Sequence, residues 1–524
     1  MKHLFIPLFV FLQMFLIAKA QTVTGPKGEV FKVRVVANKL SDAWEVTYGP
    51  DNYLWITEAK GYKVSRIDPV SGSKEILLDL NEAKDFPRYD KIPDSVDEGK
   101  PWPQGGLMGL ALHPRLLTGK PYVYLAYIYS FAGVKDKGKG CKENAGGCFF
   151  TTKIVRYNYD SAARILNNPI VLCDSIPAGN DHNSGRLLIA PVAGKNFLFY
   201  SSGELGAGQF DNAGRTNKAQ NTNSYEGKIH RFNVEPDTDN NQYDKWIPND
   251  NPFNNTKQSA VWSIGHRNAQ GLMYAVIGGV GRIYSSEHGP FSDDEINIIE
   301  KGKNYGHPLV IGYNDGNYDG LAAGVTSNTS LPGMWHTAYP TIISERANAL
   351  KIGKDYRNPI KTLYPNKNNF LRSILTQQRD DDKSNPEWPS EAPSSIDVYT
   401  STAISGWKNS LLIPTLKGGK LVRLQLNKAG TGVTGDTINY FKGKMRYRDI
   451  AISPDGTKIY LSVDSTSVSS GPSEENQKDV SYPGTILEFE YTGNTTGSIL
   501  DKKRKATGNS SNEKAEFVKN YGKL

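Results

Sequence analysis

A repeated order of short strands is the sequence feature that most limits how this chain can fold. A loose unit recurs: a turn leads into an alternating apolar strand, then comes a second strand, then a third that carries a basic residue between apolar ones. The copies begin at Trp44, Gly109, Arg186, Gly271, Ser395 and Arg448. Short strands with period-two alternation indicate an all-β chain. We therefore predict a six-bladed β-propeller of four-stranded antiparallel blades, because radial repetition protects the strand edges.

A pair of β-sandwiches is the competing architecture. It would explain the alternation of apolar and polar residues, but not the recurring order of turn, strand, strand and basic strand. Two stretches break the repeat: residues 312–363, which are Gly- and Asn-rich and then mixed, and the polar residues 379–390. Long loops in a compact fold usually carry function, so we expect both stretches to contribute to it.

The two ends of the chain differ from the repeat region. Residues 1–20 combine an early Lys2, an apolar run and a small-residue cleavage signal, which predicts a secretory signal peptide cleaved before Gln21. No later segment reaches about 18 uninterrupted apolar residues, so we predict a periplasmic or secreted protein that does not span a membrane. We expect one propeller domain over residues 21–492 and a basic, disordered tail over 493–524.

Charge and cysteine content exclude two classes of protein. The net charge of +8 is small for 524 residues, and much of it lies in the run Lys502–Lys505, so we predict no nucleic-acid binding. Three cysteines are too few for a disulfide scaffold. Cys141 and Cys148 bracket a Gly-rich loop and could close a local disulfide, which would leave Cys173 as a buried free thiol.

His182 is the candidate general base. It lies beside the carboxylate of Asp181, just before an apolar strand. Histidine has the side-chain pKa nearest neutral pH, which suits proton transfer. The local alternative is a turn in which Asp181 and Asn183 bond their own backbone.

Further polar side chains occupy comparable positions in other blades, which in a propeller converge on one axial funnel. They come from Gln104, Arg267, Asn268, Gln270, Lys417, Arg446 and Arg448. Four of these are cations, which would repel one another unless an anion filled the pocket. Because the planar fork of arginine suits carboxylates, the group favours a multi-carboxylate ligand. Each arginine taken singly could instead bond a neighbouring blade. Strand alternation points Arg446 and Arg448 to the same side.

A turn-rich acidic segment over residues 286–295 is a candidate calcium site. The backbone carbonyls of Gly289 and Pro290, with the carboxylates that follow, are the hard oxygen ligands that Ca²⁺ prefers. The segment lacks the spacing of an EF-hand loop.

Taken in order, these segments resemble the soluble quinoprotein glucose dehydrogenases of the glucose/sorbosone dehydrogenase family, six-bladed propellers that use pyrroloquinoline quinone (PQQ). The resemblance runs from about residue 40 to 491. Its firmest segments are 104–114, 181–191, 265–271, 287–306, 392–395, 406–418 and 446–456.

The resemblance implies oxidation of a glucose-like aldose at C1 to its lactone, with hydride passing to C5 of PQQ and Ca²⁺ polarising the quinone. It implies these catalytic residues: His182 as the base, Arg267 and Glu204. It implies these sugar-binding residues: Gln104, Asp181, Gln209 and Trp388. It implies these cofactor-binding residues: Arg267, Asn268, Gln270, His288, Ser390, Ala392, Lys417, Arg446 and Arg448. It implies calcium at Gly289 and Pro290, and a second calcium region with Asp294, Glu295, Tyr305 and Asp315.

The chain departs from the family pattern at several of these positions. Glu204 aligns with an aspartate, His288 with a glutamine and Ser390 with a threonine. The loop before Trp388 is shorter and lacks the family's cysteine pair, and Gln209 aligns only loosely. The cofactor half of the site is therefore kept better than the sugar half.

Two other functions fit parts of the pattern. A calcium-dependent propeller lactonase or other hydrolase could use His182 to activate water, but it has no use for four cations. A non-catalytic sugar-binding propeller would need neither the cations nor a base. For the dehydrogenase we expect a sugar substrate and a soluble electron acceptor, either a quinone or cytochrome-like, and the family resemblance also allows a homodimer.

Overall fold

The computed structural model describes residues 21–86, 104–131, 149–208, 212, 215–239, 244–254, 257–324, 339–380, 389–465 and 479–495. The predicted signal peptide, Cys141 and Cys148 lie outside these residues. Cys173 is a free thiol, as predicted, but it is half-buried rather than buried.

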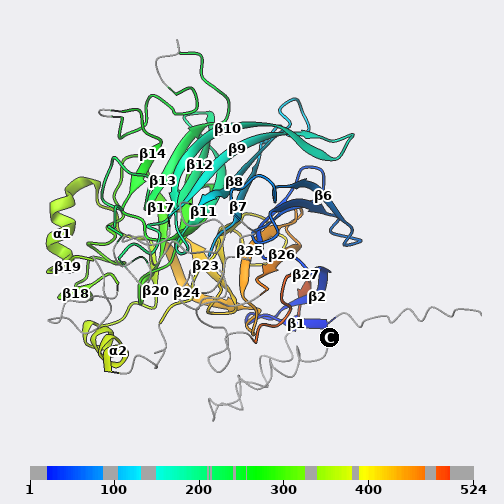
Figure 1. Ribbon diagram of the computed structural model, residues 1–524. Coiled ribbons are helices and arrows are strands. Elements are labelled where there is room, and N and C mark those ends of the chain that lie inside the picture. The colour runs from blue at the N-terminus through cyan, green and yellow to red at the C-terminus, as the bar shows by residue number, and fades with distance from the viewer. Residues whose placement is uncertain are drawn as a thin grey trace, which may run out of the picture.

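Six antiparallel sheets confirm the predicted propeller (Figure 1). Blade 1 contains β3 (Ala43–Tyr48), β4 (Leu54–Glu58), β5 (Lys63–Ile67) and β6 (Lys74–Asp79). Blade 2 contains β7 (Leu107–Leu112), β8 (Tyr122–Phe131), β9 (Phe150–Asp160) and β10 (Ile165–Ala178). Blade 3 contains β11 (Ser184–Val192), β12 (Lys195–Ser202), β13 (Lys228–Asn233) and β14 (Val261–Ile264). Blade 4 contains β15 (Ala269–Ile277), β16 (Val280–Glu287), β17 (Asp294–Ile299) and β20 (Lys361–Leu363).

The last two blades complete the ring. Blade 5 contains β21 (Asp397–Tyr399), β22 (Ser410–Pro414), β23 (Leu421–Leu426) and β24 (Val433–Tyr440). Blade 6 contains β25 (Tyr447–Ile452), β26 (Lys458–Val463), β27 (Thr485–Asn494), β2 (Glu29–Ala37) and β1 (Gln21–Thr24). The first strand of each blade contacts the first strands of both neighbours, so β3, β7, β11, β15, β21 and β25 form a closed inner ring.

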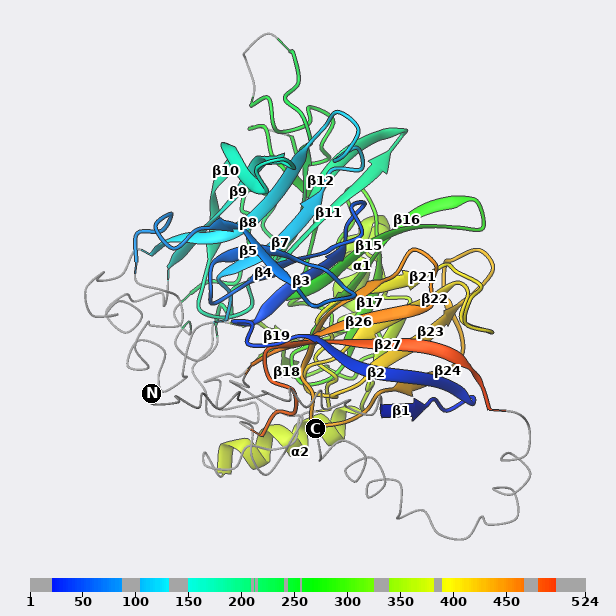
Figure 2. The same ribbon diagram turned by 90° about the vertical axis from the view of Figure 1, so that its right-hand side faces the viewer.

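Strands from the two ends of the chain close the propeller. β2 pairs antiparallel with β27, and Figure 2 shows the two side by side. Phe31 of β2 is fully buried and meets Phe441 edge-on, with ring centroids 5.0 Å apart. β27 runs to Asn494, and the Thr495 amide donates to the Gly28 carbonyl over 2.8 Å. The propeller therefore extends past the predicted boundary at residue 492, because these last residues complete the pairing with the N-terminal strands.

One arginine fills the centre of the ring. Arg186 of β11 is buried, and its guanidinium lies 2.6 Å from a carboxylate oxygen of Glu45 and 3.1 Å from one of Asp449. It also donates to the backbone carbonyls of Gln270 at 2.9 Å and Ser394 at 3.2 Å. Blade 3 is thus joined at the axis to blades 1, 4, 5 and 6.

The first of the two predicted breaks in the repeat, residues 312–363, is an insertion in blade 4. Between β17 and β20 the chain forms β18 (Leu321–Ala322), β19 (Thr341–Ile342), α1 (Glu345–Ile352) and a short 3₁₀ turn (Gly353–Asp355). The helix α2 (Asn368–Asp380) follows β20, and Figure 1 shows both helices at one edge of the molecule. Among the described residues, neither helix has the length and apolar character needed to cross a bilayer.

Candidate active site

His182 lies in the loop that joins β10 to β11. Its backbone has a φ of 44°, which turns the chain sharply before the inner strand of blade 3. Asp181 Oδ1 accepts the His182 amide at 3.0 Å, and Asn183 Oδ1 accepts the Gly179 amide at 2.9 Å. The turn bonds of the local alternative therefore form, and they fix the backbone that carries His182.

The His182 ring is paired with a buried carboxylate. Its Nδ1 lies 2.5 Å from Oε1 of Glu204, a residue with no exposed surface. The second oxygen of Glu204 accepts the Ala207 amide at 2.7 Å. Gly203 makes the approach possible, because a Cβ there would lie 1.7 Å from the His182 carbonyl oxygen. The longer glutamate thus reaches the histidine, and a fixed carboxylate at Nδ1 leaves Nε2 as the basic atom.

Glu204 connects this pair to blade 4. Its amide donates to the Arg267 carbonyl at 2.8 Å, and the Arg267 guanidinium donates to the His288 carbonyl at 3.4 Å. Beside it, Asn268 Oδ1 accepts the amide of Ser184 at 3.0 Å. These bonds bring the predicted base and three of the predicted cofactor residues into one group.

Three polar atoms of this group are buried without a hydrogen-bond partner among the described residues: Arg267 Nε, Asn268 Nδ2 and His288 Nε2. Burial, together with the nearby charges of Arg267, His182 and Arg448, holds the pKa of His288 well below its usual value. Unsatisfied buried polar atoms are costly, so these three atoms are available to bind a polar ligand.

The cations of blade 6 are partly neutralised. Arg448 forms a two-pronged ion pair with Asp464, at 3.0 and 2.6 Å, and donates to Gln270 Oε1 at 2.7 Å. Arg446 Nε lies 4.0 Å from the same carboxylate, and burial lowers the pKa of Arg446 to about 10. Both arginines therefore lie near the carboxylate of Asp464. The inference that only a ligand could offset the cations is wrong, because Asp464 supplies a negative charge. Lys417, the third cation predicted to bind carboxylates, is half-buried and follows β22 of blade 5.

Asp294 joins two predicted site segments. Its carboxylate accepts the Gly289 amide at 3.0 Å and the Glu391 amide at 2.7 Å, and Ser390 Oγ donates to it at 2.9 Å. The Ala392 amide is 3.3 Å away. Asp294 thus fixes the backbone of the loop that contains Gly289 and Pro290.

The residues predicted for a second calcium region do not gather around one point. Glu295 accepts bonds from the Gly312 amide and from Asn297 Nδ2, each at 2.9 Å. The Tyr305 ring stacks on His266 at 4.6 Å, and Asp315 accepts the Asn317 amide at 3.1 Å. Within the described part of the chain, no three His, Cys, Asp or Glu side chains group as metal ligands.

The predicted sugar-binding residues are only partly placed. The Gln104 amide donates to the Asn180 carbonyl at 2.7 Å, and its carbonyl accepts Asn183 Nδ2 at 2.6 Å, so Gln104 lies against the His182 loop. Gln209 and Trp388 lie outside the described residues.

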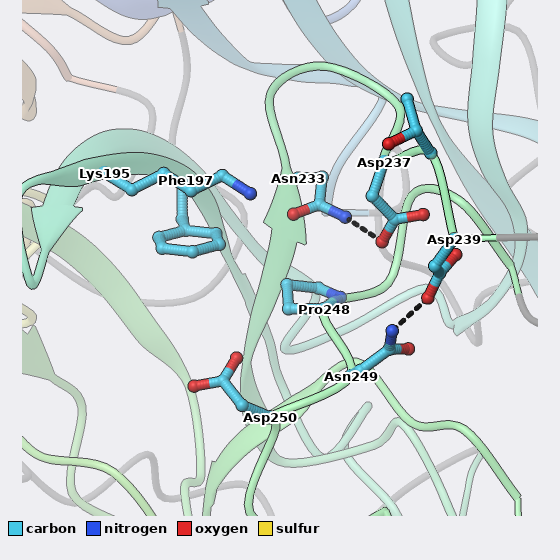
Figure 3. A pocket seen from close by; sticks show the side chains of 9 residues that line it. Lys195, Phe197, Asn233, Asp237, Asp239, Pro248, Asn249 and Asp250 are labelled. Atoms are coloured by element: carbon cyan, nitrogen blue, oxygen red, sulfur yellow. Dashed lines mark hydrogen bonds between the residues drawn. The ribbon is translucent and has the colours of Figure 1, made fainter.

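A separate hollow of about 370 Å³ lies at the other end of β12 (Figure 3). Lys195, Asp237, Asp239 and Asp250 are among its lining residues. Asp237 is bonded to Asn233 and Asp239 to Asn249, as the dashed lines in Figure 3 mark. Because Lys195 begins β12 and Glu204 follows its end, this hollow is not part of the His182 group.

Two functional candidates were missed from the sequence. Asp464 directly follows β26, where Val463 pairs with Tyr447, so a register prediction could have placed it beside the two arginines. Glu287 ends β16 and binds the turn that carries Arg267 and Asn268. The sequence placed Glu287 in the acidic segment 286–295, but nothing in that segment indicated that it would bind the backbone of Arg267 and Asn268.

Known proteins resemble this chain along most of its length. A family profile described as Glucose / Sorbosone dehydrogenase matches residues 40–342 and 344–469. Quinoprotein glucose dehydrogenase B of Acinetobacter calcoaceticus is 31% identical over 484 residues, covering 89% of this chain and 92% of that protein. Aldose sugar dehydrogenase YliI of Escherichia coli is 26% identical over 440 residues, covering 83% and 90%.

Solved structures share the fold. The PQQ-bound aldose sugar dehydrogenase of Streptomyces coelicolor aligns with a TM-score of 0.56 at 23% identity, covering 90% of this chain and 100% of that one. The apo form of the soluble aldose sugar dehydrogenase of Escherichia coli aligns with a TM-score of 0.57 at 22% identity, covering 88% and 100%.

Proposed function

The chain belongs to the glucose/sorbosone dehydrogenase family, and we propose that it oxidises an aldose sugar at C1 to the lactone with PQQ and Ca²⁺. The observation that carries the proposal is the paired His182 and Glu204 beside three unpartnered buried polar atoms. That arrangement offers a base on one side and polar contacts for a cofactor on the other.

The residues present fit an oxygen-rich cofactor. Asn268 Nδ2 and Arg267 Nε are donors without a protein acceptor in the described residues, which suits quinone or carboxylate oxygens. Lys417, Arg446 and Arg448 would hold the carboxylates, and Asp464 would keep the two arginines in place. The chemistry that PQQ supplies when bound is two-electron acceptance at an ortho-quinone.

His182 would remove the proton of the C1 hydroxyl. Nδ1 faces Glu204, so Nε2 would take the proton, and the carboxylate would stabilise the imidazolium that forms. Asp181 and Gln104, which lie against the same loop, would bind sugar hydroxyls. Burial of Glu204 strengthens this pairing because little water competes for the carboxylate.

Calcium would bind at the Gly289 and Pro290 carbonyls. The hydrogen bonds from Gly289 and Glu391 to Asp294 support this assignment, because they fix the loop geometry before an ion arrives. Backbone oxygens are ordinary calcium ligands, and the remaining positions would be filled by ligand oxygens and water.

Reconstitution tests the proposal. We expect purified protein with added PQQ and Ca²⁺ to reduce a redox dye when an aldose is supplied, and chelation to abolish the reaction. A panel of aldoses would identify the preferred sugar. The proposal would be refuted if adding PQQ caused no spectral change and if no sugar supported dye reduction.

A further inference from the structure

A buried line of polar residues supports the turn that carries Arg267 and Asn268. Ser263 Oγ lies 2.9 Å from His266 Nε2, and His266 Nδ1 lies 3.0 Å from Glu287 Oε2. Ser263 and His266 have no exposed surface, and Glu287 has 2%. The order serine, histidine and carboxylate is that of a nucleophilic triad, but a fully buried serine cannot meet a substrate. Any role of these three residues must therefore come from their contacts with neighbouring residues.

The second oxygen of Glu287 is directed at the candidate site. Glu287 Oε1 accepts the backbone amide of Arg267 and also the amide of Asn268, the latter at 3.2 Å. The carbonyl of Arg267 accepts the Glu204 amide at 2.8 Å. The backbone of Arg267 is therefore held on one side by the carboxylate of Glu287 and on the other by the residue that pairs with His182.

Each of the two side chains on this turn has a buried polar atom without a hydrogen-bond partner among the described residues. Arg267 Nε and Asn268 Nδ2 lack hydrogen-bond partners among the residues described, and their direction depends on the backbone that Glu287 holds. Charge-assisted hydrogen bonds from two adjacent amides to a buried carboxylate are strong and specific in geometry. The His266 ring, which stacks on Tyr305, holds the other carboxylate oxygen and so fixes its orientation.

We propose that Glu287 is a positioning residue, which orients Arg267 and Asn268 toward the cofactor and sets the affinity of the site for PQQ. This inference rests on the proposed function. Ser263 and His266 support Glu287, and none of the three touches the sugar.

Three variants and one matched control test the inference. Glu287→Ala removes both amide contacts, Glu287→Asp shortens the reach to them, and Glu287→Gln keeps an oxygen for the amides and a polar atom for His266. Glu345→Ala is the control, because Glu345 is also buried and accepts amides, from Ile311 at 2.8 Å and Gly316 at 3.0 Å, but lies at the start of α1.

The measurements are the Kd for PQQ by spectroscopic titration, the kcat and KM for the sugar, and the thermal midpoint. We expect Glu287→Ala to bind PQQ about tenfold or more weakly, with Glu287→Gln restored close to wild type. Glu345→Ala should lower the thermal midpoint without weakening PQQ binding. If Glu287→Ala does not fold, Glu287→Asp should show the loss of affinity.

Two different outcomes of the PQQ titrations would contradict the positioning role and the proposed function, respectively. A folded Glu287→Ala or Glu287→Asp with wild-type affinity for PQQ, and only a lowered midpoint, would overturn the positioning role while leaving the proposed function intact. A wild-type protein that does not bind PQQ would overturn the proposed function and this inference together.

Discussion

At the scale of single residues, the account depends on which atom of His182 takes the proton. Glu204 holds Nδ1 at 2.5 Å, and Nε2 lies 3.7 Å from Asp181. A general base typically contributes about 10² to 10⁴-fold to a rate. We predict that His182→Ala lowers kcat by a factor in that range while PQQ affinity stays near wild type, since the base does not hold the cofactor.

Steady-state rates with a PQQ titration check this prediction. Asn183→Ala is the comparison. It removes the hydrogen bonds from Asn183 Nδ2 to the carbonyls of Gln104 and Gly179, which hold the loop, but it leaves the His182 imidazole in the protein. If His182→Ala lost PQQ binding instead of turnover, the residue would belong to the cofactor site rather than to proton transfer.

Residue identity was partly predictable. His182 and Arg267 lie in motifs at blade starts, and alignment with the family led to Glu204. Asp464 and Glu287 were not predicted, because each acts on a partner distant in sequence: Asp464 on Arg448, and Glu287 on the amide of Arg267. A carboxylate at a strand end shows which residue it will meet only once the register of the strand pair is known.

At the scale of elements, the repeated strand pattern did not predict that N-terminal strands would complete blade 6. β2 precedes the first copy, and its partner β27 ends the last one. Period-two alternation predicts a strand but not its neighbour, whereas within a copy the turns between successive strands favour pairing. The inner strands could therefore be placed from sequence, and the edge supplied by β1 and β2 could not.

The closure predicts a large effect of one side chain. Phe31 is fully buried in β2, among Trp407, Phe441 and Tyr491. We expect Phe31→Ala to lower the free energy of unfolding by about 3–5 kcal/mol, since it leaves a cavity in an aromatic cluster. Lys32→Ala on the exposed face of the strand is the control. Denaturant unfolding measures the stability of both variants. If Phe31→Ala and Lys32→Ala each lowered the free energy of unfolding by the same small amount, the role of β2 in closing the propeller would be contradicted.

At the scale of the whole molecule, the blades are joined at the axis by Arg186. Its guanidinium contacts Glu45 and Asp449 and lies 4.3 Å from the centre of the Trp44 ring. Removing one partner of a buried ion pair leaves the other charges uncompensated, at a cost of about 3–5 kcal/mol. We predict that Arg186→Met lowers the free energy of unfolding by this amount.

Arg164→Met provides the comparison, because Arg164 forms an exposed ion pair with Glu75. Exposed ion pairs contribute about 0–1 kcal/mol to stability. The free energy of unfolding of Arg164→Met, measured in denaturant, should therefore lie close to that of the wild type. Equal stability of the two variants would mean that the axial contacts do not hold the ring together.

The reaction itself offers the most direct test of the account. The reconstituted protein should be given an aldose deuterated at C1, and its product and rate compared with those of the unlabelled sugar. Removal of hydrogen from C1 predicts slower turnover and a lactone that has lost the deuterium. Deuterium retained at C1, or no sugar oxidised in the presence of PQQ and Ca²⁺, would contradict the proposal.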